Sequence, residues 1–342
     1  MAGFGWRART GVAVGAGLAL LVAGALLAAY AFIGNQPPAP YVYEWPAASG
    51  APAAGAADEA GLALAQRVPG AELKAVGLRS RATGRLLASG AVLARADAPD
   101  LIIAWQSGVG EPVLRADISA AEEQALVAAL ETHLPADSLV FAMPSLSYRL
   151  AAMVPARFPL AAADDSAMLR TPDPWAGASR AITAIEKRWR PAPDRQADRL
   201  FESFLEALAA DDRRGIARLQ LMAETRPSYV ILHLRDAFGI GLAMPGRFGV
   251  AHRDFPGSSD VHDLTRLVKT WAQDAGFPAY AVMPRDADAV RAYFLDETAG
   301  GPSLLGQLLP FNPARIGQIP AAQLVFQHGG YWVYRIAEVG KG

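Results

Sequence analysis

An uncharged apolar segment near the start of the chain constrains its fold more than any other feature. No charged residue occurs between Thr10 and Gln36, and Val12 to Ile33 are almost wholly apolar. At 1.5 Å per residue, a helix over Val12–Ile33 would be about 33 Å long, which is enough to cross a bilayer core of roughly 30 Å. We therefore predict one N-terminal transmembrane helix.

The charges that flank this segment predict its orientation. Arg7 and Arg9 precede it, and the next charged residue is Glu44. The positive-inside rule then makes residues 1–34 a cytoplasmic tip and anchor, and places the C-terminal domain of a single-pass inner-membrane protein in the periplasm. The alternative is a cleavable signal peptide, because Ala29-Tyr30-Ala31 fits a small-x-small cleavage site. Against it, the apolar run exceeds the roughly 7–15 residues of a signal-peptide core.

The composition excludes several classes of protein. The chain of 342 residues contains no cysteine, which rules out disulfides, thiolate metal sites, Cys-ligated clusters and covalent c-type haem. Its 32 Lys and Arg residues balance 33 Asp and Glu residues, for a formal net charge of −1. A nucleic-acid binder normally needs a basic face. We therefore expect no nucleic-acid partner. We also expect no cofactor, with a non-covalent haem held by His or Met ligands as the alternative that the lack of cysteine leaves open.

Residues 35–60 have the composition of a tether. Ala47–Ala57 is rich in Ala, Gly and Pro and has too little bulky apolar surface to pack. Before it, Tyr41–Trp45 has the alternating aromatics of a strand. This island could be an aromatic anchor at the membrane interface, a strand added to the domain, or incidental linker aromatics, and the sequence leaves these open.

The remaining residues, 61–342, form the predicted globular region. Their patterns predict an α/β or α+β fold, with a mixed sheet and flanking helices. A subdivision near residues 178–224 is left open. Strands are expected at 72–79, 86–95, 101–105, 138–143, 228–234, 240–244, 279–283, 290–295, 324–327 and 331–336. Helices are expected at 120–134, 146–153, 178–190, 195–210, 212–224, 260–275 and 303–309.

The densest group of polar side chains lies at residues 252–263. It contains the candidate metal ligands His252, Asp254 and His262. Two imidazoles and the carboxylates of this segment could hold a divalent metal or supply a general acid and base. The structural alternative is a strand-to-helix loop, in which a residue of 258–260 caps the helix and Asp254 helps to fix a turn.

Two other positions have competing interpretations. His233 lies in a strand-like segment, which favours a hydrogen-bonded sheet residue over a ligand. Ser145, Tyr148 and Arg149 follow a buried strand, a place where α/β folds often present functional side chains. A helix N-cap explains Ser145 equally well. Phosphate-loop, dinucleotide, nucleophile-elbow and zinc-protease motifs do not occur, so the catalytic residues stay unknown.

Four stretches together carry a resemblance to a known family. They are Tyr41–Trp45, Asp137–Met153, Tyr229–His262 and Val290–Phe311. The arrangement resembles the HaoB family, hydroxylamine oxidation protein B, which accompanies the octahaem hydroxylamine oxidoreductase of the periplasm.

The resemblance implies a membrane-anchored periplasmic accessory protein of hydroxylamine oxidation and nitrification. Such a protein would assemble, tether or couple the multihaem hydroxylamine oxidoreductase rather than act as an enzyme. The family supplies no active-site residues to carry over. The alternative from the residues is an extracytoplasmic metal-assisted hydrolase that uses the 252–263 loop.

Overall fold

The computed structural model describes most of the chain beyond the predicted anchor. The described residues are 21–22, 24, 37–45, 59–109, 113–135, 137–257, 261–286, 288–297 and 300–338. Within these ranges no helix is both long and apolar enough to cross a bilayer. The predicted anchor, Val12–Ile33, lies almost entirely outside them.

The described strands form three sheets. The N-terminal sheet has the order β1 (Tyr41–Glu44), β2 (Glu72–Ser80), β3 (Leu86–Ala94) and β4 (Leu101–Ser107). The central sheet has the order β10 (Ala322–His328), β11 (Tyr331–Ile336), β6 (Ser228–His233) and β5 (Leu139–Phe141). The third sheet has the order β7 (Gly249–Pro256), β9 (Ala289–Asp296) and β8 (Ala279–Pro284). Only β5 and β6 pair in parallel, so the central sheet alone is mixed.

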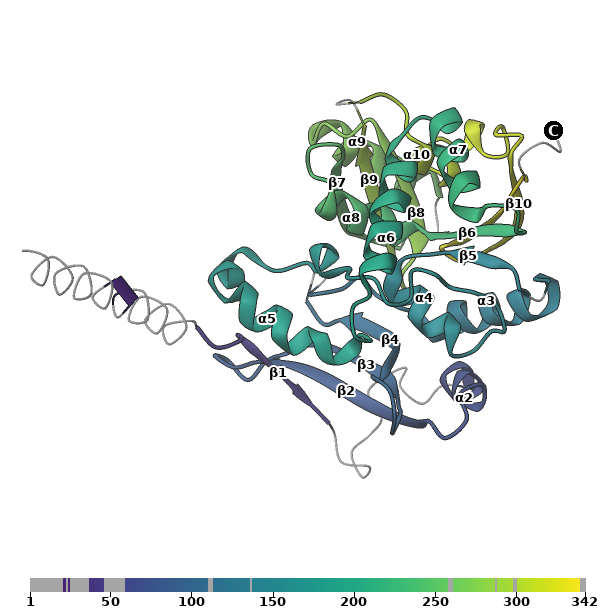
Figure 1. Ribbon diagram of the computed structural model, residues 1–342. Helices are drawn as coiled ribbons and strands as arrows, with labels where there is room; N and C mark the ends of the chain where they lie inside the picture. Colours follow the sequence, from purple (N-terminus) through teal and green to yellow (C-terminus); the bar gives the residue numbers. More distant parts are fainter. Residues whose placement is uncertain are drawn as a thin grey trace, which may run out of the picture.

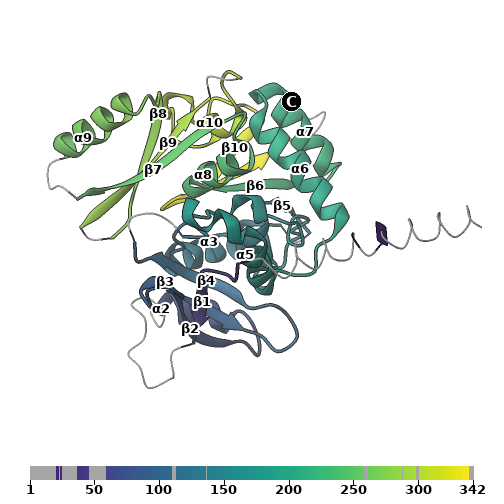
Figure 2. The ribbon, with the colours of Figure 1, turned by 90° about the vertical axis from the view of Figure 1, so that its left-hand side faces the viewer.

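Helices cover and separate these sheets (Figure 1). The α-helices are α2 (Glu59–Gln66), α3 (Ala120–His133), α4 (Pro144–Ala151), α5 (Ser179–Glu186), α6 (Arg195–Ala209), α7 (Asp212–Ala223), α8 (Leu234–Ala243), α9 (Val261–Asp274) and α10 (Leu304–Leu308). The 3-10 turns are η1 (Ser166–Met168), η2 (Asp173–Ala178), η3 (Lys187–Trp189) and η4 (Pro313–Arg315). In Figures 1 and 2 the N-terminal sheet lies at one end of the molecule and α9 lies away from it. The third sheet reaches the N-terminal sheet at Arg285, just after β8, whose Nη2 donates to the Ser107 carbonyl at 3.3 Å.

The central sheet is buried on both faces. All six residues of β6 are buried, which is the pattern of a strand covered on both sides. Val230 and Leu232 join a core with α6, α7, α8 and α10, whereas Tyr229 and Ile231 join a second core with α2, α3 and α4. The alternation of side chains along β6 therefore links the two largest cores.

The N-terminal sheet is likewise covered on both faces. Ile103 of β4 contributes to the core that this sheet shares with the central sheet, and Ile102 contributes to a core with α5. Tyr41 pairs in register with Ser80 and is 0% exposed. Of the three interpretations of Tyr41–Trp45, a strand added to the domain is therefore confirmed.

The mixed α and β class is confirmed, but one predicted element is wrong. Residues 240–244, expected as a strand, belong to α8 and the residue after it. The helix is fixed at its start by a capping box in which the Asp236 carboxylate accepts from the His233 backbone N–H at 2.7 Å. A short apolar run is compatible with both elements, and the cap decides between them. The subdivision near 178–224 stays a prediction.

Candidate functional site

The two parallel strands end at the same edge of the central sheet. β5 leads into α4, which begins at Pro144, and β6 leads directly into α8, which begins at Leu234. Both helix N-termini, with the positive ends of their dipoles, therefore lie at this edge. In open α/β sheets, ligands commonly bind outside the carboxyl ends of parallel strands.

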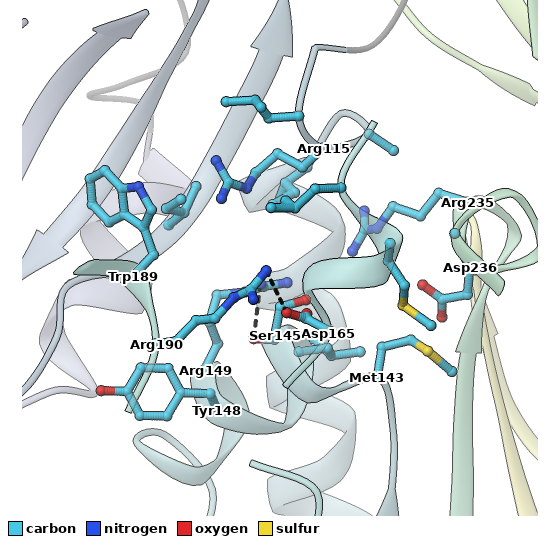
Figure 3. A pocket seen from close by; sticks show the side chains of 18 of the residues that line it. Arg115, Met143, Ser145, Tyr148, Arg149, Asp165, Trp189, Arg190, Arg235 and Asp236 are labelled. Carbon is cyan, nitrogen blue, oxygen red and sulfur yellow. Dashed lines mark hydrogen bonds and ion pairs between the residues drawn. The ribbon is translucent and has the colours of Figure 1, made fainter. Parts of the chain in front are cut away.

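A cavity of about 120 Å³ lies at this edge and is lined by arginine. Its walls come from β4, α4, η3, the first turns of α8, and the segments 114–118 and 165–170. Figure 3 shows the side chains of Arg115, Arg149, Arg190 and Arg235 around it, and Arg170 is a fifth lining arginine. These cations come from five separate segments of the chain, so only the tertiary fold brings them together.

Arg149 is held from behind by a buried carboxylate. Its Nε donates to Glu123 Oε1 at 2.7 Å and its Nη2 donates to Glu123 Oε2 at 2.9 Å. The two side chains are 5% and 0% exposed. Burial alone would lower the pKa of Arg149, but Glu123 outweighs it and the pKa is raised. This two-pronged pair fixes the first helix of the site, α4, onto α3.

Arg115 belongs to a buried cluster that includes β1. Glu186, at the end of α5, accepts from Tyr41 Oη at 2.6 Å, from Tyr43 Oη at 2.8 Å and from Arg115 Nη2 at 2.5 Å. Burial, followed by the charge of Glu186, raises the pKa of Tyr41 far above its usual range. The cluster therefore joins the wall of the cavity to the first strand of the domain.

The backbone beside Arg115 is constrained. Leu114 has a φ of 66°, in the left-handed region that non-glycine residues seldom adopt. Two backbone hydrogen bonds of 2.9 Å, exchanged with Arg170, hold it there, and its side chain is 0% exposed. Such conformations persist only where the surroundings enforce them, and they are common at functional sites.

Arg190 closes the cavity from the side of η3. Its Nη1 lies 2.8 Å from Asp164 Oδ1 and its Nη2 lies 2.7 Å from Asp165 Oδ1. Asp165 lines the cavity with Arg190. The adjacent aspartates, which the sequence places in a loop, therefore serve as the counter-ions of one arginine.

Arg235 differs from these three arginines, since no carboxylate oxygen of the described residues lies within 4.0 Å of it. Its Nη1 donates to the Asp117 carbonyl at 3.1 Å and its Nη2 donates to Tyr331 Oη at 2.7 Å. The nearest acidic neighbour in sequence, Asp236, is buried, and burial raises its pKa to about 6. Arg235 therefore has neutral oxygen partners, whereas Arg115, Arg149 and Arg190 are each paired with a carboxylate.

His233 is a structural residue at the start of α8. Its Nδ1 accepts from the Arg235 backbone N–H at 3.0 Å, so the ring proton is on Nε2, which lies 3.1 Å from Glu122 Oε2. Burial, with the nearby Arg235, lowers its pKa to about 3. The expectation of a hydrogen-bonded residue at the end of a strand is confirmed.

A second cavity, of about 380 Å³, lies beyond Arg235, which lines both. It is bounded by β4, by the start of α3 and by β8 and β9 of the third sheet. Arg291 holds Asp254 through two hydrogen bonds of 2.6 and 3.0 Å, and its Nη1 lies 3.0 Å from Asp117. These pairs join the third sheet to the rest of the domain.

The side chains that line the first cavity could bind a small polar group. Arg235 and Ser145 supply hydrogen-bond donors, and Asp165 and Asp236 supply acceptors. The two helix N-termini favour negative charge at the same edge. The arrangement is thus suited to binding and positioning.

The sequence matches the family described as "HaoA-associated protein HaoB" over residues 9–336. The chain belongs to the HaoB family. No curated protein and no solved structure matches it. The family resemblance stated from four stretches of sequence is therefore confirmed over nearly the whole chain.

In this HaoB-family chain, the predicted metal ligands occupy different environments. Asp254, on β7, is bound by Arg291, and Arg285 Nη1 lies 2.8 Å from it. His252, two residues earlier on the strand, packs edge-on against Phe238 at 4.9 Å between ring centroids. His262 is exposed on α9. Among the residues that the structure describes, no group of three His, Asp or Glu side chains could hold a metal ion. The metal-assisted hydrolase stays a prediction.

Two local interpretations of these segments are corrected. Residues 252–256 are part of β7 rather than a loop, and Asp254 forms cross-strand ion pairs instead of fixing a turn. The proposed caps at 258–260 lie outside the described residues. Ser145 is not a cap, because α4 begins at Pro144 after Met143. The proline pre-sets the first helical turn and leaves the Ser145 side chain at the cavity.

Arg149 was found by its position after a buried strand, whereas the other lining cations were missed. Arg115, Arg190 and Arg235 have no motif around them, and each reaches the cavity from a different element. The one available signal for Arg235 was its place directly after the strand at 228–233.

His252 makes the stability of the domain sensitive to acid. Burial and the charge of Arg291 lower its pKa to about 4, against about 6.5 in the unfolded chain. Between these values the unfolded chain binds a proton that the folded chain does not, so stability falls as the pH falls from about 6.5 to about 4. We expect His252→Phe to reduce this loss by up to about 3 kcal/mol.

The measurement is urea unfolding at pH 7 and pH 4.5. His328→Phe is the matched control, because His328 is exposed on β10 and should leave the pH dependence unchanged. Equal acid sensitivity in both variants would contradict the role given to His252.

Proposed function

We propose that this HaoB-family chain is a membrane-anchored periplasmic accessory protein that associates with the hydroxylamine oxidoreductase HaoA. The observation that carries the proposal is the family match over residues 9–336, whose description names HaoA as the associated protein. The match begins at residue 9, so it includes the apolar segment that we propose as the anchor. Tethering or assembly of the partner enzyme at the membrane is the role we assign.

The structure supports this role by the way in which the domain begins. Ala39 is 4% exposed, and the Pro40 carbonyl accepts from the Arg81 backbone N–H at 2.8 Å. The packed domain therefore starts within a few residues of the apolar segment. A protein built in this way would hold its partner close to the bilayer.

Co-purification tests the association. The full chain is extracted from native membranes in mild detergent, and the visible spectrum and polypeptides that accompany it are recorded. We expect a haem Soret band in proportion to this chain, together with a separate multihaem polypeptide. A colourless, partner-free preparation would count against the association with HaoA.

A pair of arginine substitutions tests the anchor. Leu21→Arg with Val22→Arg places two charges near the middle of the apolar segment, where each costs about 2.5–3.5 kcal/mol of insertion free energy. We expect this variant to leave the membrane fraction. Leu221→Arg is the control, because Leu221 is 78% exposed on α7. A mature chain that lacks the apolar segment, measured by mass, would instead support the cleaved signal peptide.

A further inference from the structure

We infer that the β1 edge of the N-terminal sheet, together with the β2–β3 turn, rests on the anionic lipid headgroups of the membrane. This inference rests on the proposed anchor. We call residues 79–86, with the exposed Trp45 and Arg188, the membrane-facing surface.

The connection is too short to let the domain move away from the bilayer. Only residues 34–36 separate Ile33 from Pro37, the first residue of the continuous described segment 37–45. Ile33 and Pro37 are four residues apart, so their Cα atoms can be at most about 14 Å apart, even in a fully extended chain. The chain is packed into the domain from Ala39, which is 4% exposed, and Tyr41 is 0% exposed with its hydroxyl bound to Glu186.

The β2–β3 turn lies directly beside the place where the chain joins the domain. Tyr41 is opposite Ser80 in the antiparallel pair, and Arg81 bonds back to Pro40 through its backbone N–H. The Arg81 side chain also donates to the Tyr41 carbonyl at 3.2 Å. The turn is therefore next to the point at which the anchor enters the domain, so an anchored domain has this turn close to the membrane.

The turn carries positive charge and apolar surface. Residues 79–86 include Arg79, Arg81 and Arg85 and no acidic residue, and Leu86 is 40% exposed. Glu44 pairs with Arg79 alone. Exposed arginines are attracted to the negative charge of anionic lipid headgroups.

The opposite end of β1 adds an aromatic group of the kind found at bilayer interfaces, because Trp45 directly follows Glu44. The exposed Arg188 guanidinium lies 5.1 Å from the Trp45 ring centroid and 5.9 Å from that of Tyr43. Trp45 is 39% exposed. Indole rings are enriched at the level of lipid headgroups, where their apolar and polar parts are both satisfied.

This orientation decides which surfaces a periplasmic partner could reach. In Figure 2, α9 lies at the end of the molecule away from β1 and β2. With β1 on the membrane, that end points away from the bilayer.

The absence of cysteine allows a direct test with the full chain. Ala82→Cys in the β2–β3 turn and Ala275→Cys just after α9 are matched substitutions at exposed alanines. Each variant is inserted into nanodiscs containing phosphatidylglycerol, labelled with a fluorophore, and quenched by lipids that carry a headgroup nitroxide. We expect a several-fold greater loss of fluorescence at position 82 than at position 275.

Charge reversal then tests the contribution of the arginines. Arg81→Glu with Arg85→Glu, made in the Ala82→Cys chain, should reduce quenching at position 82, as should nanodiscs of uncharged lipid. The matched control is Arg213→Glu with Arg214→Glu on α7, which should leave the quenching at position 82 unchanged. Failure of the full chain to enter nanodiscs would refute the proposed anchor. Insertion with equal quenching at positions 82 and 275 would overturn this inference while leaving the anchor intact.

Discussion

Replacing Glu186 with alanine is expected to lower the free energy of unfolding by about 3–5 kcal/mol. The carboxylate is 0% exposed and accepts from Tyr41, Tyr43 and Arg115. Its removal leaves the Arg115 cation without its counter-ion and two phenol hydroxyls without an acceptor. Because both tyrosines belong to β1, the variant should also loosen the first strand of the N-terminal sheet.

Urea unfolding of the full chain in detergent measures the change. The control is Glu206→Ala, whose carboxylate forms an exposed pair with Arg218 and should matter by less than about 1 kcal/mol. Glu186→Gln separates the ion pair with Arg115 from the hydrogen bonds of the tyrosines. The glutamine keeps an acceptor for the tyrosine hydroxyls but has no charge to pair with Arg115. A loss for Glu186→Ala no larger than that of the control would refute the role of this cluster.

The second large effect is expected at Arg149 of the candidate site. Arg149→Met should cost about 3–5 kcal/mol, because it leaves the fully buried Glu123 carboxylate without its partner. Arg235→Met should cost less than about 2 kcal/mol. The Arg235 side chain gives up two hydrogen bonds to neutral oxygens, and its loss leaves no carboxylate without an ion-pair partner.

A double variant makes this comparison sharper. Glu123→Leu with Arg149→Met removes both charges of the pair and should recover most of the loss, since an apolar pair of similar size commonly replaces a buried ion pair without cost. A double variant as unstable as Arg149→Met would mean that packing, and not the orphaned charge, causes the loss. Equal losses for Arg149→Met and Arg235→Met would contradict the difference in their counter-ions.

Regular elements with strong local patterns were predictable. The helix expected at 120–134 is α3, and Ser119 caps it: the Ser119 Oγ accepts from the Glu122 N–H at 3.3 Å. The hairpin of β10 and β11 follows from alternating residues around two glycines. The strand expected at 240–244 failed because an apolar run of five residues has no period of its own, and a cap several residues upstream decides its structure.

The site was predictable only where a side chain follows a strand. Arg149 was indicated in this way, since residues beyond the carboxyl end of β5 must lie at the sheet edge. The group at 252–263 is dense in sequence but is divided by the structure. His252 and Asp254 share a face of β7, but Asp254 is bound by Arg291 of the neighbouring strand and His252 packs against Phe238, whereas His262 lies on α9.

The sequence by itself determined the family, the mixed class of fold and the uncharged segment on which the anchor proposal depends. These properties are local or spread evenly along the chain, so they need no knowledge of contacts. Only the tertiary structure decided the cavity and its ion pairs. Arg115 and Glu186 are 71 residues apart, and Arg149 and Glu123 are 26 apart. A buried charge is tolerated only beside a partner of opposite charge. The partner can belong to any element that the fold places next to it, so a local sequence pattern does not identify it.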